Sequence, residues 1–298
     1  MSNDSDLSRF RIWLLAIRPK TLPAGIVPVV IGAALAYDTG IFHTATFLFA
    51  LAGSILIQIG ANFANDLFDY LKKSDDSERV GPLRVTQAGL VSPAQMKIAT
   101  FVVFFLAFLV GIYLVYRGGM PIVIIGLASI LFGVLYTGGP HPLGYLGLGD
   151  ILVLIFYGPV AACGTYYVIT LDFNSTVLLA GIPPGMLATA LLTVNNLRDI
   201  DNDRRTGKRT LAVRFGRSFA RVEYVLMLTG AALFPILIYL VDGAHKWSMV
   251  SAAILIPGAT AARSILTQTS GPALNRALAE TGRLTALYGL FFSAGWLL

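Results

Sequence analysis

Two short acidic segments share one pattern in a chain of 298 residues, of which only 13% are charged. In each, an asparagine is followed four residues later by an aspartate, then by another acid and a stretch rich in Lys and Arg. The pattern consists of Asn62, Asp66 and Asp69 in the first segment and Asn195, Asp199 and Asp203 in the second. At about 100° per residue, each set falls on one face of an α-helix. The oxygen atoms of each set could therefore act together.

Oxygen ligands of this kind suit Mg²⁺, which typically takes one or two carboxylates together with waters and substrate phosphates. The basic residues that follow could neutralise the remaining phosphate charge. We therefore predict a Mg²⁺ site for a phosphorylated ligand, in which the carboxylates are both catalytic residues and metal ligands and nearby amides assist. The predicted carboxylates are Asp66, Asp69, Asp199 and Asp203, and the assisting amides are Asn62, Asn65 and Asn195.

The elements that position these residues are expected to be membrane-spanning helices, because 56% of the chain is hydrophobic and apolar runs recur along its whole length. Each run is close to the ~20 residues that a helix needs to cross a bilayer. We predict an all-α polytopic membrane bundle of about nine transmembrane helices, forming a single integral membrane domain over residues 1–298. The predicted spans are 21–37, 45–69, 98–116, 120–137, 148–169, 176–197, 222–241, 248–267 and 282–298.

Basic residues orient this bundle. With a cytoplasmic N-terminus, all but two of the 22 Lys and Arg residues, Arg117 and Lys246, fall on the cytoplasmic side, as the positive-inside rule requires. Both acidic segments then lie at cytoplasmic helix ends. The hydrophilic segments 70–97 and 198–221 are expected to be cytoplasmic loops that cap the site. A single acidic pair near a membrane surface is often only solvated, but two copies at matching helix ends favour a shared ligand.

An apolar bundle beneath two acidic helix ends predicts an amphiphilic ligand with a diphosphate head and a hydrocarbon tail, such as a polyprenyl diphosphate. Metal-assisted loss of diphosphate would leave an allylic cation that apolar walls protect from water. An ion-coupled transporter is the alternative from a different class, since intramembrane acids and repeats also mark ion pathways. The position of the acids at helix ends, away from the mid-bilayer, favours the enzyme.

The combination of Asn65-Asp66-x2-Asp69 with Asn195-x3-Asp199-x3-Asp203 resembles the two Asp-rich motifs of the UbiA superfamily of intramembrane aromatic prenyltransferases. This resemblance covers nearly the whole chain. It implies nine helices around a central cavity, Mg²⁺ as cofactor, and diphosphate held between the two motifs. The chain departs from the common family pattern at position 73. The family usually has a third acid there, whereas this chain has Lys73, and its next acids are Asp75 and Asp76. It departs again four residues after Tyr136. The family often has lysine at that position, and this chain has Pro140.

Four further stretches resemble the 1,4-dihydroxy-2-naphthoate branch of this superfamily: residues 79–84, 136–140, 144–150 and 195–199. The branch implies transfer of a polyprenyl group from polyprenyl diphosphate to 1,4-dihydroxy-2-naphthoate, with loss of CO₂ and diphosphate. The product would be a demethylmenaquinol of menaquinone biosynthesis, made at the inner membrane of a bacterial cell. The expected partners are these two substrates and membrane lipid, with no nucleic acid. The alternative within the superfamily is another aromatic acceptor, such as 4-hydroxybenzoate.

Six other residues are candidates for the site. Arg18, Arg84 and Lys208 could bind phosphate or a substrate carboxylate, although basic residues near a span often serve only as topology anchors. Two tyrosines, Tyr136 and Tyr145, could hydrogen-bond the hydroxyl groups of the aromatic acceptor. Asp150 could be a plain helix N-cap, and the resemblance favours it as an active-site acid.

Overall fold

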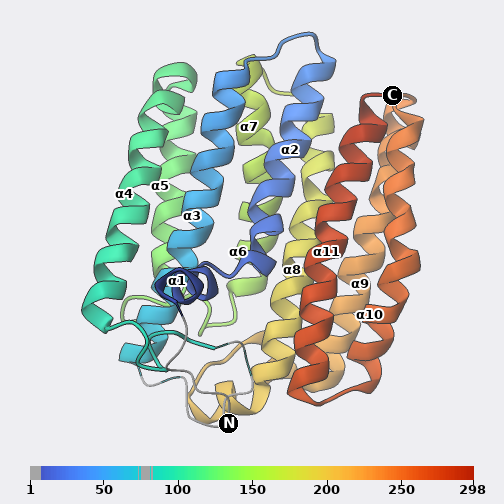
Figure 1. The fold of residues 1–298 in the computed structure, drawn as a ribbon. Coiled ribbons are helices and arrows are strands. Elements are labelled where there is room, and N and C mark those ends of the chain that lie inside the picture. The colour runs from blue at the N-terminus through green and yellow to red at the C-terminus, as the bar shows by residue number, and fades with distance from the viewer. Residues whose placement is uncertain (1–7, 73, 75–80, 82) are drawn as a thin grey trace.

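The computed structural model describes residues 8–72, 74, 81 and 83–298, and these residues form helices and connecting turns without any β-strand. Figure 1 shows that most helices run side by side in one bundle. In chain order the helices are α1 (Arg9–Ile17), η2 (Pro19–Thr21), α2 (Leu22–Asp38), α3 (Thr44–Leu71), α4 (Pro93–Gly118), α5 (Met120–Leu135), α6 (Gly149–Ile155), η3 (Phe156–Val160), α7 (Ala161–Thr170), α8 (Ser175–Arg205), α9 (Leu211–Asp242), η4 (Lys246–Ile254), α10 (Leu255–Thr267) and α11 (Gly271–Trp296).

Each predicted span coincides with one helix or with a consecutive set of helices. The span 148–169 corresponds to α6, η3 and α7 in series, and the span 248–267 corresponds to η4 and α10. Within the described residues, seven helical segments are long and apolar enough to cross a membrane, and α5 is a shorter apolar helix. The all-α polytopic bundle is therefore confirmed.

The segment 198–221 differs from the loop that we predicted. Helix α8 continues to Arg205 and α9 begins at Leu211, so only residues 206–210 connect them. The Thr210 hydroxyl accepts a hydrogen bond from the Val213 backbone N–H, which caps the start of α9. On these turns Arg204, Arg205 and Arg214 are exposed, while Ala212 and Ala220 are buried. The prediction was wrong there because hydropathy alone does not recognise a polar amphipathic helix.

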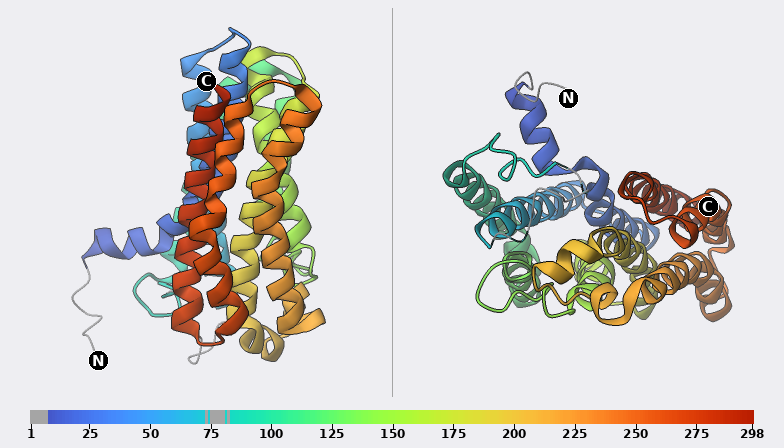
Figure 2. Two further views of the ribbon diagram at one scale, coloured as in Figure 1. Left: turned by 90° about the vertical axis from the view of Figure 1, so that its right-hand side faces the viewer. Right: turned by 90° about the horizontal axis from the view of Figure 1, so that it is seen from below.

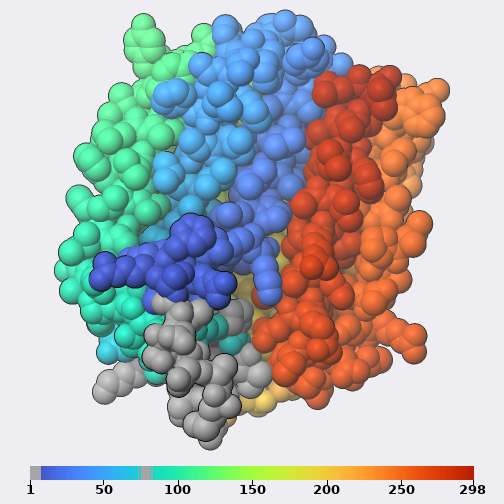
Figure 3. All heavy atoms as spheres, in the orientation of Figure 1, coloured from blue at the N-terminus to red at the C-terminus, as the bar shows by residue number. Residues whose placement is uncertain are grey.

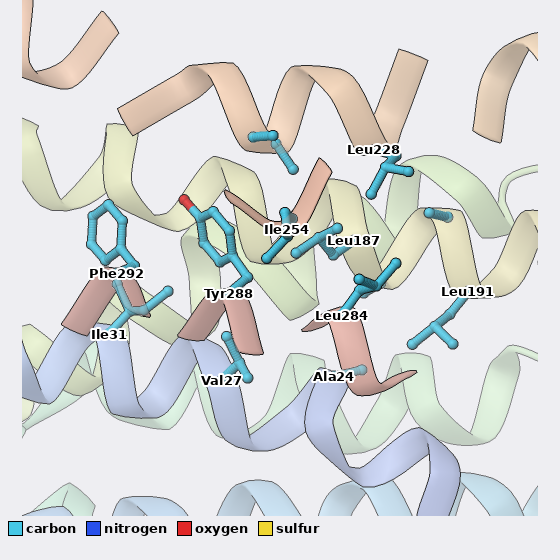
Figure 4. Close-up of a cluster of buried hydrophobic side chains, with 14 of the residues drawn as sticks. Ala24, Val27, Ile31, Leu187, Leu191, Leu228, Ile254, Leu284, Tyr288 and Phe292 are labelled. Atoms are coloured by element: carbon cyan, nitrogen blue, oxygen red, sulfur yellow. The ribbon is translucent and has the colours of Figure 1, made fainter. Parts of the chain in front are cut away.

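The core lies between α2, α8, α9 and α11, whose apolar side chains meet in Figure 4. Val27 of α2, Leu187 of α8 and Tyr288 of α11 are all buried there. Small residues allow the helix backbones to approach, as is common between membrane helices. A Cβ atom added to Gly289 of α11 would lie 2.7 Å from Val27 Cγ1. The α2–α11 seam is therefore tightly closed.

Helix α1 does not run along the bundle but projects from its side, as Figure 2 shows, and it covers part of the face seen in Figure 3. Its inner face packs on the C-terminal half of α3, where the rings of Trp13 and Phe63 have centroids 5.6 Å apart. Its outer face leaves Phe10 exposed. A short helix with this arrangement is typical of a segment that lies in the membrane interface.

Candidate functional site

The two acidic segments end α3 and α8, and the structure brings these helix ends together. Asp66 and Asp69 lie in the last two turns of α3, and Asp203 lies in the last turn of α8; all three are buried. The Asn202 amide of α8 donates a hydrogen bond to the carbonyl oxygen of Ser74, just beyond α3, at 3.0 Å. The ends of α3 and α8, which carry the two motifs, are therefore in contact.

Asp69 is the centre of the strongest polar network. Its carboxylate accepts hydrogen bonds from Tyr145 Oη at 2.7 Å, Arg84 Nη2 at 2.8 Å and Lys208 Nζ at 3.0 Å. Ser74 Oγ adds a fourth contact at 3.1 Å. These partners come from three different connections between helices. A buried carboxylate with two cationic partners is stable in its charged form, because its charge is compensated within the protein.

Asp66 makes different contacts. Its two carboxylate oxygens accept the backbone N–H groups of Val85 and Thr86, at 3.2 Å and 3.1 Å. The side chain of Val85 is itself fully buried. Asp66 therefore fixes the turn that follows the first motif against α3, and this turn carries Arg84 to Asp69.

The asparagines of the first motif organise the wall beside this network. Asn62 donates to the Ile17 carbonyl at 2.9 Å and to Thr21 Oγ1 at 3.1 Å, which fastens the junction of α1 and α2 to α3. The Asn65 side-chain oxygen accepts a hydrogen bond from Thr137 at 2.8 Å, after the end of α5. Asn62 and Asn65 thus place α2, α3 and α5 relative to one another.

Sequence reasoning did not single out Lys72 and Arg198. Lys72 Nζ donates to the carbonyl oxygens of Thr137 and Gly139, and burial lowers the pKa of its ammonium. Arg198 binds its neighbour Asp199 through two nitrogens, at 2.8 Å and 2.6 Å, and also contacts Asn275 of α11 at 2.9 Å. The position of Arg198 inside the second motif could have indicated its role. In the sequence we used this residue only as one of the basic residues that orient the bundle.

Tyr145 and Asp150 are placed by the segment between α5 and α6. The hydroxyl of Tyr145 points to Asp69, and its ring lies under the Lys208 ammonium, 4.8 Å from ring centroid to nitrogen. Asp150 lies in the first turn of α6 and is buried, and its Oδ1 has no hydrogen-bond partner among the described residues. A buried carboxylate oxygen without a partner is costly, so it is a candidate to bind a ligand group.

A cavity of about 550 Å³ lies inside the bundle. Polar side chains line one end of it, and the remainder is apolar, with walls from α2, α3, α4, α5, α6, α7 and α8. The polar lining residues include Arg18, Asn62, Asn65, Tyr136 and Asn195. Since Asn65 precedes Asp66 and Asn195 begins the second motif, the polar end of the cavity adjoins the acidic network. This arrangement would accept an amphiphile with its charged head at that end.

The residues present fit Mg²⁺ by their chemistry, because the candidate ligands are carboxylate and amide oxygens. Among the described residues, no group of three or more Asp, Glu, His or Cys side chains forms a complete metal site by itself. Mg²⁺ does not need such a group, since one or two carboxylates with phosphate oxygens and waters complete its coordination shell.

Lys73, Asp75, Asp76 and residues 79, 80 and 82 lie outside the described residues.

Comparison with known proteins extends over almost the whole chain. The sequence profile of the UbiA prenyltransferase family matches residues 25–297. The 1,4-dihydroxy-2-naphthoate octaprenyltransferase of Haemophilus influenzae is 35% identical over 97% of both chains. The Escherichia coli protein of the same name is 35% identical over 98% of this chain and 97% of its own. A solved UbiA homologue from Archaeoglobus fulgidus, bound to GPP and Mg²⁺, has a TM-score of 0.65, with 13% identity and coverage of 96% and 100%.

Proposed function

The chain belongs to the UbiA prenyltransferase family, and on that premise we propose that it transfers a polyprenyl group from polyprenyl diphosphate to 1,4-dihydroxy-2-naphthoate. The reaction releases CO₂ and diphosphate and gives a demethylmenaquinol, a step of menaquinone biosynthesis. The observation that carries this proposal is the near-complete, 35% identical match to relatives named for this activity. The apolar cavity with a polar end suits both substrates.

The diphosphate head would bind at the meeting point of α3 and α8. Arg84 and Lys208 already compensate a buried carboxylate there, so a guanidinium and an ammonium are held in place for phosphate oxygens. Carboxylate and amide oxygens of the two motifs would hold Mg²⁺, namely those of Asp66, Asp69, Asp199, Asp203, Asn65 and Asn195. Bound Mg²⁺ would neutralise the charge that develops on the leaving diphosphate.

In this proposal Asp69 is the central metal ligand. The oxygens of Asp66 are less available to the metal. Both oxygens of Asp66 already accept backbone N–H groups, whereas Asp69 accepts hydrogen bonds from the side chains of Arg84, Lys208 and Tyr145. Rearrangement of those side chains could free an Asp69 oxygen for the metal. Asp66 would contribute mainly by holding the turn that carries Arg84.

The aromatic acceptor would lie beside the polar end of the cavity. Tyr136 lines this end and could hydrogen-bond a ring hydroxyl, and Arg18 could hold the acceptor carboxylate. Asp150, with its unpartnered oxygen, could accept the proton of the second hydroxyl during the attack and return it once CO₂ has left. The electron-rich ring then attacks the allylic carbon as the bond to diphosphate breaks, and the ring carbon that forms the new bond loses CO₂.

We further propose that the protein lies in the inner membrane of a bacterial cell, with its N-terminus in the cytoplasm. The acidic ends of α3 and α8 and most basic residues then face the cytoplasm, as the positive-inside rule requires.

The experiment that tests the activity is mass spectrometry of the products formed by membranes containing the protein. Octaprenyl diphosphate would be supplied with equal amounts of 1,4-dihydroxy-2-naphthoate and 4-hydroxybenzoate. We expect only the naphthoate to be prenylated, with loss of the mass of CO₂. Prenylated hydroxybenzoate alone would identify the other acceptor class. Uptake of a labelled substrate into vesicles without any chemical conversion would instead support the transporter.

A further inference from the structure

A polar pocket of about 300 Å³ lies between α10 and α11 and shares no lining residue with the central cavity. We name it the α10–α11 pocket, and its lining residues are Thr260, Arg263, Ser264, Thr267, Gln268, Ala273 and Arg276. We propose that this pocket binds the phosphate group of an anionic phospholipid. The proposal uses the membrane orientation proposed above and goes beyond the prenyl-transfer activity.

The lining residues of α10 form a polar stripe on the outside of that helix. Their spacing of i, i+3, i+4 and i+7 places four of them on one helical face: Thr260, Arg263, Ser264 and Thr267. The residues that α10 buries lie on the other side of the helix: Gly258, Ala261 and Ile265. The stripe is therefore turned away from the protein core and available to a ligand from the membrane.

The two arginines of the pocket have no acidic partner in the part of the chain that the structure describes. No ion pair or side-chain hydrogen bond with the described residues holds either guanidinium group. Arg198 and Arg217, by contrast, each bind a neighbouring carboxylate. The sequence from Gly243 to Leu298 also contains a single acid, Glu280, and four Lys or Arg residues. The pocket is therefore a site of uncompensated positive charge.

The depth of the arginines fits the level of lipid phosphate groups. Arg276 and Trp296 are 20 residues apart on α11, which corresponds to about 30 Å, the thickness of a hydrocarbon core. Arg263 lies about one turn before α10 ends at Thr267. Figure 1 shows the turn between α10 and α11 at the same end of the bundle as the end of α8. The pocket therefore lies at the membrane surface on the side of the acidic motifs.

Helix dipoles also permit an anion in the pocket. The positive N-terminal end of α11 borders it at Ala273, and Ser270 forms no side-chain capping hydrogen bond there. The negative C-terminal end of α10 would repel an anion, but Arg221 of α9 donates to the carbonyl oxygens of Ile265 and Gln268, at 3.1 Å and 3.4 Å. This contact compensates the unfavourable helix end.

A phospholipid fits this surface better than a soluble anion, because exposed apolar side chains continue from the arginines toward the bilayer centre. On α10, Ile256 lies on the same face as Arg263 and is 79% exposed. On α11, Leu287 and Leu290 lie on the same face as Arg276 and are also exposed. Acyl chains could pack along these residues while the arginines bind the phosphate. Basic pockets between membrane helices are suited to anionic lipid headgroups for this reason.

Removing the two charges tests the proposal. The double variant Arg263→Gln with Arg276→Gln keeps polar side chains at two exposed positions and breaks no ion pair among the described residues, so it should fold. The matched control is Arg204→Gln with Arg209→Gln. It removes the same charge from two exposed arginines at the same end of the bundle, outside the pocket.

The readout is native mass spectrometry of the purified, delipidated protein with added phosphatidylglycerol or phosphatidylcholine of the same acyl chains. We expect the wild type to bind the first phosphatidylglycerol at least about tenfold more tightly than phosphatidylcholine, because each basic residue at a membrane surface contributes about fivefold. The double variant should lose this preference and the control should keep it. Equal affinity for both lipids in the wild type, or an equal loss in the control, would overturn the proposal.

A competition measurement distinguishes a lipid from a soluble anion. Radiolabelled phosphatidylglycerol bound to the immobilised protein would be challenged with excess inorganic phosphate or diphosphate, at an ionic strength held constant with sodium chloride. We expect neither anion to displace the lipid, because neither can use the apolar surface beside the arginines. Displacement by either anion would identify a soluble phosphate as the ligand and overturn the proposal. These measurements need no prenyl donor or acceptor, so their outcome is independent of the proposed activity.

Discussion

Lys208 Nζ lies 3.0 Å from a carboxylate oxygen of Asp69, and protein encloses both side chains almost completely. The two residues are 139 positions apart in the sequence, one just after α8 and the other near the end of α3. This contact therefore joins the two acidic segments directly. It also places a cation where the proposed diphosphate head would bind.

Replacing Lys208 should lower activity more than replacing its neighbour Arg209. Lys208→Met removes a charged hydrogen bond worth about 1.5–3 kcal/mol, so we expect kcat/KM to fall about tenfold to a hundredfold. Arg209→Met is the matched control, because this side chain is exposed. Steady-state rates at varied donor concentration measure both effects. Equal losses in the two variants would contradict a specific role for Lys208.

Asp66→Ala should release the turn that contains Val85 and Thr86. The substitution leaves two buried N–H groups without an acceptor, so we expect a loss of stability of about 1–3 kcal/mol. Hydrogen exchange of the residues 83–91 should accelerate at the same time. Asp201→Ala is the control, since this carboxylate is 63% exposed beside Arg217 and its pair is worth less than about 1 kcal/mol. Unchanged exchange in Asp66→Ala would show that the carboxylate does not hold the turn.

Tyr145→Phe should impair use of the donor while leaving the fold intact. The variant loses the 2.7 Å hydrogen bond to Asp69 but keeps the ring against Lys208. A net loss of about 1 kcal/mol predicts a fall of about fivefold in kcat/KM for the prenyl donor. Tyr136→Phe should instead raise the KM for the aromatic acceptor, because Tyr136 lines the cavity. The same effect on both substrates in both variants would contradict these separate roles.

Metal removal should abolish turnover reversibly. Treatment with EDTA is expected to stop product formation, and added Mg²⁺ should restore it, because hard oxygen donors dominate both motifs. Asp69→Asn and Asp199→Asn should each raise the Mg²⁺ concentration needed for half-maximal rate. Full activity in EDTA would contradict the Mg²⁺ assignment, and an unchanged requirement in both variants would remove these two carboxylates from the ligand set.

Much of the architecture could be predicted because it depends on local properties of the sequence. Apolar runs of spanning length predicted the helices, and the basic residues predicted that the acidic ends share one side. The spacing of Asn195, Asp199 and Asp203 already implied helical turns beyond the apolar run. Hydropathy assigned the same residues to a loop, since these turns are polar and gain stability from tertiary contacts such as Arg198 with Asn275.

The role of each carboxylate was harder to predict from the sequence than the position of the site. Asp66 and Asp69 have the same residue type and nearly the same burial, so the sequence could not distinguish a carboxylate that binds backbone N–H groups from one that binds cations. That difference depends on which connecting segments between helices fold back onto each carboxylate.

The most direct test of the central claim is product formation by the purified protein from octaprenyl diphosphate, 1,4-dihydroxy-2-naphthoate and Mg²⁺. We expect a decarboxylated, prenylated product from the wild type and none above background from either Asp69→Ala or Asp199→Ala, with both variants folded. Turnover at the wild-type rate in both variants would contradict the claim that the two acidic helix ends act on one diphosphate.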